Sequence, residues 1–255
     1  MEKSKEQKQS LCHIKTFSEF VDQHKNCFEK RKYFVINEKY EITKREPSFL
    51  LELGYIYFQT KDKTIENVVE EEFLYTYKEK NKRIDRLSKY EKNRLKESFR
   101  RSLVNKDSIH SVKLGNELLH RNKEEFLEIM YKISLISSDC NKLIKTFFVE
   151  FLLDEVGDFN KNREQTDEIV RNIINYFVKS ENEYINYSCK NSIEYFINNK
   201  TDLLYKKIYN ENYDKIVKKY NIQSISKLEL EINEKDYDKL SESKKILYNY
   251  LKNKK

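Results

Sequence analysis

Residues 123–179 read KEEFLEIMYKISLISSDCNKLIKTFFVEFLLDEVGDFNKNREQTDEIVRNIINYFVK, and this stretch decides the fold class. Apolar residues recur there every three or four positions within 123–137, within 139–156 and again within 166–179. That spacing places them on one face of an α-helix. Asp139 and Thr166 are residues that commonly cap helix N-termini, and Gly157 stands where a helix often ends. The stretch therefore predicts three successive amphipathic helices.

The same periodicity continues on both sides of this stretch. It predicts further helices over 16–28, 64–73, 88–104, 108–121, 181–199, 201–220 and 241–251. Thr16, Ser88 and Ser241 are the expected N-caps of three of them. Phe49–Phe58 is too uniformly apolar to show one face, so a buried helix and a strand both remain open there.

Two short segments favour β-structure instead. Tyr33–Ile36 and Tyr40–Thr43 flank a short polar turn and predict a small hairpin. Leu228–Ile232 alternates apolar and acidic residues, which is typical of a strand, and the hairpin would be its natural partner. The predicted fold is mainly α: an irregular multi-helix bundle of about nine or ten helices with a small β-hairpin element near the N-terminus.

Composition limits the class of protein. Ile, Leu, Val and Phe make up 28% of the 255 residues, enough to bury a core, while 3 Gly and 1 Pro exclude a collagen-like chain. So few glycines cannot build a phosphate-binding loop, and no residue constellation proposes a reaction, so an enzyme is the least favoured class and no cofactor is expected. We expect a single helical domain over 1–255 with a soft boundary near 157–165.

Amino-acid usage indicates an AT-rich genome, because Ala and Trp are absent while Lys and Asn are abundant. The polar start Met1–Gln9 lacks a following apolar segment, so no signal peptide is expected. No apolar run approaches the ~20 residues that span a bilayer, so no membrane partner is expected. The four scattered cysteines favour reduced thiols and a cytoplasmic location.

Positive charge is concentrated in one part of the chain. Residues 78–107 hold twelve Lys or Arg and five Asp or Glu, which equals the whole net charge of +7. Helices at 88–104 and 108–121 joined by a short turn also have the outline of a helix-turn-helix. We therefore predict a nucleic-acid-binding accessory or regulatory protein, of a mobile element or parasite, with DNA or RNA as its partner. The predicted contact residues within 83–106 are Arg83, Arg86, Lys89, Lys92, Arg94, Lys96, Arg100, Arg101 and Lys106.

Nineteen tyrosines support an alternative prediction. Tyrosine is enriched at protein interfaces, where its ring is buried and its hydroxyl stays hydrated. A protein-interaction module of the immunity or inhibitor type would then use the C-terminal helices, with Tyr205, Tyr209 and Tyr213 as its contact residues. A tyrosine-rich core, with tyrosine in place of Trp and Leu, explains the same pattern.

Two clusters of residues have some of the features of metal sites. Cys12, His24 and Cys27 lie within 16 residues and are weak zinc candidates, but His24 and Cys27 fall on an apolar stripe, which favours core packing. Glu117 and His120 have the spacing of half a di-iron site, yet no second copy exists among the four histidines. We therefore expect no metal.

Overall fold

The computed structural model describes residues 11–30, 34–36, 42–44, 46–77, 88–158, 161–180 and 183–254. In these residues it confirms a mainly helical fold, with eleven α-helices and three short 3₁₀ segments. The helices are α1 (Phe17–His24), α2 (Leu50–Thr60), α3 (Lys63–Tyr75), α4 (Lys92–Val104), α5 (Ser108–Arg121), α6 (Lys123–Ile136), α7 (Asn141–Val156), α8 (Arg163–Lys179), α9 (Lys190–Lys200), α10 (Leu203–Lys219) and α11 (Glu242–Asn253). The predicted number of helices, nine or ten, was slightly low. The apolar segment that the sequence left open as helix or strand is also a helix, at residues 50–60.

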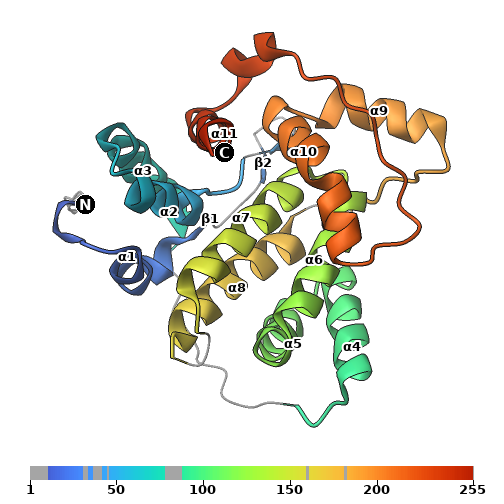
Figure 1. Cartoon of the computed structure of the whole chain (residues 1–255), viewed down its shortest axis with the longest axis horizontal. Coiled ribbons are helices and arrows are strands. Elements are labelled where there is room, and N and C mark those ends of the chain that lie inside the picture. Colours follow the sequence, from blue (N-terminus) through green and yellow to red (C-terminus); the bar gives the residue numbers. More distant parts are fainter. Residues whose placement is uncertain are drawn as a thin grey trace.

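Helices α7 and α8 pack together at the centre of the molecule (Figure 1). On one side α5 packs against α8, α4 and α6; on the other, α1 and α2 contact each other and the central pair. Helices α10 and α11 cover a third side, where α10 packs on α7 and α11 packs on α2 and α3. The buried apolar residues form one continuous cluster from Leu11 to Tyr248. The two ends of the described chain are thus joined by a shared core.

Several helix ends follow the sequence signals. The side chains of Thr16, Asp107 and Ser241 each accept a hydrogen bond from a backbone N–H in the first turn that follows, which confirms three expected starts. Gly157 ends α7 with φ of 69°, as predicted. Helix α4 begins four residues after the expected Ser88. Ser88 instead donates from its backbone N–H and hydroxyl to the buried carboxylate of Glu117, at 2.7 and 2.9 Å.

Strand pairing in the described residues is short. Phe34–Ile36 (β2) pairs antiparallel with Ile42–Lys44 (β3), within the stretch where a hairpin is expected; residues 37–41 lie outside the described residues. Glu29–Lys30 (β1) pairs with Thr76–Tyr77 (β4). These pairs span three and two residues, so the β content is minor beside the helices.

The predicted strand at Leu228–Ile232 is wrong, because this segment is not in a strand. Side chains of α10 satisfy its backbone instead: the Leu228 N–H donates to the Tyr209 hydroxyl at 2.6 Å, and Asn210 donates to the Leu230 carbonyl at 2.6 Å. The alternation is real, since Leu228 and Leu230 are buried, but they pack on a helix rather than forming part of a sheet.

Candidate functional site

Most cations of the predicted basic surface on α4 are paired with carboxylates. Lys92 lies 2.9 Å from Glu125 of α6, and Lys96 lies 3.4 Å from Glu125 and 3.1 Å from Glu128. Burial opposes the charge on Lys96, but these carboxylates raise its pKa overall. Two of the five cations of α4 therefore pair with carboxylates of α6 and hold the two helices together.

The two arginines expected to make the best contacts share one acid. Arg100 and Arg101 donate to the carboxylate of Glu97, at 2.8 and 2.6 Å. Hydrogen bonds from Arg100 and Arg101 lower the pKa of Glu97 to about 2, so this carboxylate stays charged at every physiological pH. Both guanidinium groups remain exposed, but each would have to leave Glu97, or share it, to bind a phosphate.

Three predicted contact residues of the described chain have no ion pair. Lys89 and Lys106 are exposed, and the guanidinium carbon of Arg94 lies 4.5 Å from the centre of the Tyr90 ring. Lys106 occupies the turn between α4 and α5 with φ of 57°. Arg83 and Arg86 lie outside the described residues. The predicted contact residues therefore do not form one continuous unpaired basic surface in the described chain, because paired and unpaired cations are mixed along it.

The burial of half of the second helix argues against the helix-turn-helix interpretation. Helix α5 is packed between α4, α6 and α8, and seven of its fourteen residues are buried. A Cβ on Gly115 would lie 2.3 Å from the Cδ1 atom of Ile174 on α8, so glycine is what allows the two helices to approach so closely. Contacts with three neighbouring helices leave only one edge of α5 exposed, at Ile109, His110 and Lys113, which is a narrow surface for a recognition helix.

The predicted tyrosine interface is also corrected by burial. Tyr205 and Tyr209 are fully buried and Tyr213 is 4% exposed. Their rings follow one another along α10, with centroids 5.5 and 5.0 Å apart. The Tyr213 hydroxyl donates to the Ile225 carbonyl at 2.5 Å. Residues four apart share one helical face, and here that face lies in the core, so these side chains stabilise the fold rather than present a surface.

The weak metal candidates do not form a site in the described residues. No three His, Cys, Asp or Glu side chains there come together in a way that could hold a metal ion. His24 packs between the rings of Phe20 and Phe73, with centroids 5.3 and 4.7 Å away, and Cys27 is buried in the core. The side chain of Cys12 lies outside the described residues. His120 contacts Asp167 at 3.2 Å, across the α5–α8 interface.

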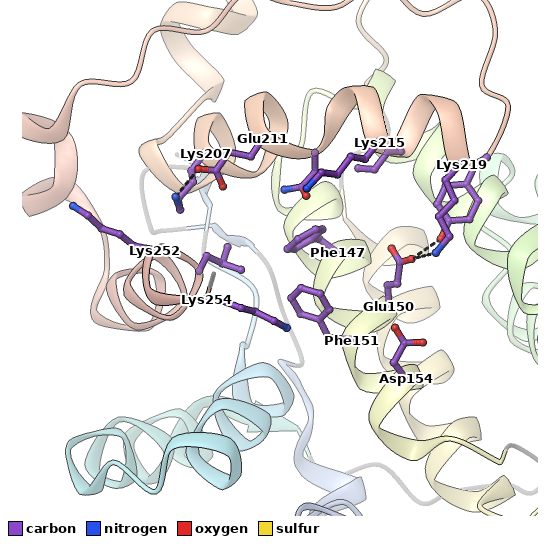
Figure 2. A pocket seen from close by; sticks show the side chains of 14 residues that line it. Phe147, Glu150, Phe151, Asp154, Lys207, Glu211, Lys215, Lys219, Lys252 and Lys254 are labelled. Atoms are coloured by element: carbon purple, nitrogen blue, oxygen red, sulfur yellow. Dashed lines mark hydrogen bonds and ion pairs between the residues drawn. The ribbon is translucent and has the colours of Figure 1, made fainter.

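A groove that sequence reasoning missed lies between α7, α10 and α11 (Figure 2). It encloses about 710 Å³. Phe147 and Phe151, one turn apart on α7, form its floor, with Ile216 and Leu251 beside them. Five lysines surround this floor: Lys207, Lys215 and Lys219 on α10, Lys252 on α11 and Lys254 just after it. A sequence signal existed, because residues 207, 211, 215 and 219 recur every fourth position on the face of α10 that does not carry the tyrosines.

Acidic residues in the groove neutralise only part of this charge. Lys207 pairs with Glu211 at 2.7 Å, and Lys219 pairs with Glu150 at 2.5 Å. Asp154 pairs with Lys123, which lies outside the groove. The remaining lysines are Lys215, which has no ion pair in the described chain, Lys252, which is 3.8 Å from Glu234, and Lys254. The groove therefore has surplus positive charge on both walls.

Glu150 fixes one end of the groove. Its carboxylate accepts hydrogen bonds from the hydroxyls of Tyr131 at 2.5 Å and Tyr220 at 2.8 Å, in addition to the Lys219 contact. Burial is the main cause that raises the pKa of both tyrosines, and the charge of Glu150 raises it further. Burial opposes the charge on Lys219, but Glu150 raises its pKa overall. Three donors on one carboxylate make this end of the groove rigid.

Comparison with known proteins adds no homologue: no family model, no curated protein and no solved structure matches the chain. In the described residues, no helix combines the length and the apolar character that crossing a bilayer requires.

Proposed function

We propose that this protein binds nucleic acid, and that the groove between α7, α10 and α11 is its contact surface in place of α4. The observation that supports this most directly is the surplus of lysines on two facing walls around two phenylalanine rings. Lysines neutralise phosphates and release counterions, and aromatic rings contact bases, so this combination suits nucleic acid better than cations alone.

Helix α4 is a weaker candidate for the same ligand. Its Lys92 and Lys96 already neutralise Glu125 and Glu128 of α6. Glu124, which is also on α6, lies 3.9 Å from Lys219 at the end of the groove. Carboxylates of α6 therefore neutralise lysines of both α4 and α10, so the groove and α4 do not form one continuous positive surface.

Two variants with the same loss of charge distinguish the surfaces. The first, Lys215→Gln with Lys252→Gln and Lys254→Gln, removes three cations from the groove. The second, Arg94→Gln with Arg101→Gln and Lys106→Gln, removes three from α4 and its turn. The affinity of each for a labelled oligonucleotide, single-stranded and duplex, would be measured by fluorescence anisotropy over a salt series.

The groove variant should lose about tenfold or more in affinity, and the salt slope should fall by about 2, because three phosphate contacts are removed. The α4 variant should stay within about threefold of the wild type, since exposed charges beyond ~8 Å are largely screened at physiological salt. The reverse order of effects would place the contact on α4. Absence of salt-dependent binding by the wild type would refute the function.

A further inference from the structure

We infer that the groove takes unpaired nucleotides, with bases against Phe147 and Phe151 and phosphates on the flanking lysines; this inference rests on the proposed function. The two rings pack edge to face, with centroids 4.7 Å apart and planes at 64°, and each also contacts the fully buried ring of Phe148. A rigid aromatic floor is what a stacking site needs, since every base has a flat face and no hydrogen-bond readout is required.

The face of Phe151 is accessible from the groove. Lys254 reaches across from the end of α11 and places its Nζ 3.5 Å from the centre of the ring (Figure 2). The ammonium of Lys254 therefore occupies the position over the ring that a base would take. A base can replace the ammonium there, and the long lysine side chain can then turn to the phosphate of the same nucleotide.

Phosphates can be held on either side of these rings. Lys215 stands on the α10 wall and Lys254 reaches the rings from the opposite wall at α11, whereas the Lys252 side chain points away from the rings, toward Glu234. Because the surplus charge is on both walls and the rings lie between them, a backbone along either wall can direct its bases to the floor. A duplex keeps its bases stacked inside and offers the floor none.

The length of the bound segment is limited by the groove itself. A volume of about 710 Å³ lies within the ~300–1,000 Å³ of small-ligand sites, so the groove holds a few nucleotides at most. At the end near α6, Glu150 and Asp154 each already neutralise a lysine, so this end has no free positive charge for a further phosphate. We therefore expect a short footprint, as at a strand end, a loop or an overhang.

The test uses the full chain and three probes of equal length: a single strand, the same strand in a duplex, which carries twice as many phosphates, and a strand of abasic sites. The single strand should bind about tenfold or more tighter than the abasic strand, with the duplex weaker than the single strand. A single strand carrying 2-aminopurine should change its fluorescence on binding, and the protein, having no Trp, adds no competing indole signal.

The aromatic contribution is tested by Phe147→Leu with Phe151→Leu. This variant should reduce single-strand affinity to the abasic level while leaving the salt slope unchanged, because the lysines remain. Phe73→Leu, at a partly buried ring on α3, is the matched control and should bind normally. Retention of the wild-type melting temperature shows that the double variant is folded; if it is not, the abasic strand alone decides.

Different results would contradict the stacking inference and the proposed nucleic-acid binding on which it rests. Equal affinity for the single, abasic and duplex probes, or an unchanged affinity of the double phenylalanine variant, would overturn the stacking inference and leave a phosphate-only contact. Failure of all three probes to bind at low salt would instead overturn the proposed function.

Discussion

At the scale of single residues, a buried ion pair joins Lys145 of α7 to Glu52 of α2. The side chains are 2% and 1% exposed, and Nζ lies 2.9 Å from Oε1. Lys145 also donates to the Ser48 carbonyl at 2.8 Å. A buried charge is tolerated only when it is paired, so each partner depends on the other. This pair fixes α2 on the central helix of the bundle.

Replacing one partner should therefore be worse than replacing both. Lys145→Met leaves the Glu52 carboxylate buried and unpaired, and should lower the free energy of unfolding by about 3–5 kcal/mol. Adding Glu52→Met should recover a large part of that loss, because the site becomes apolar. Urea denaturation of both variants measures this, with the exposed Lys113→Met as control. A double variant less stable than the single one would contradict the explanation.

At the scale of elements, α5 shows how a helix with many polar residues can pack against three other helices, α4, α6 and α8. Its face toward α8 carries Gly115, at a point where a side chain would overlap Ile174 and Phe99. Its far face carries Glu117, which is 3% exposed and binds both Ser88 and Arg121. The helix is thus held by close backbone approach on one side and by a buried carboxylate on the other.

Gly115→Ala tests the close approach. Helix propensity alone predicts a gain of about 1 kcal/mol, whereas overpacking costs typically ~1–3 kcal/mol. The added Cβ would lie 2.3 Å from Ile174 and 2.9 Å from Phe99, both in the core, so we expect net destabilisation. Thermal unfolding checks the sign. An increased melting temperature would show that α5 and α8 can separate without cost.

At the scale of the whole molecule, the C-terminal helix joins distant parts of the chain. Lys244 of α11 is 6% exposed and lies 2.8 Å from both Glu46 and Asp202. Burial opposes its charge, but the neighbouring acids raise its pKa overall. Since α11 also forms one wall of the groove, the same contacts position Lys252 and Lys254 opposite α10.

Lys244→Met should affect both stability and binding. Glu46 and Asp202 lose their ion-pair partner but are 41% and 24% exposed, so the free energy of unfolding should fall by roughly 1–3 kcal/mol. The groove should also lose affinity for nucleic acid at temperatures where the variant is still folded, because the α11 wall is no longer fixed. The exposed neighbour Lys252→Met, in contrast, should weaken binding without affecting stability. Wild-type stability of Lys244→Met would show that α11 does not depend on this contact.

Periodicity alone determined the helical class, most helix positions and several caps, because an amphipathic stripe and a capping residue act within one turn. The tertiary structure decided which stripes face inward and which charges remain free. Tyr205 and Lys207 are two residues apart on α10, and only packing on α7 makes one core and the other groove. The cations of α4 were visible in the sequence, but their partners Glu125 and Glu128 come from another helix. Charge in a segment is local, whereas its neutralisation and the shape of a groove depend on contacts between distant segments.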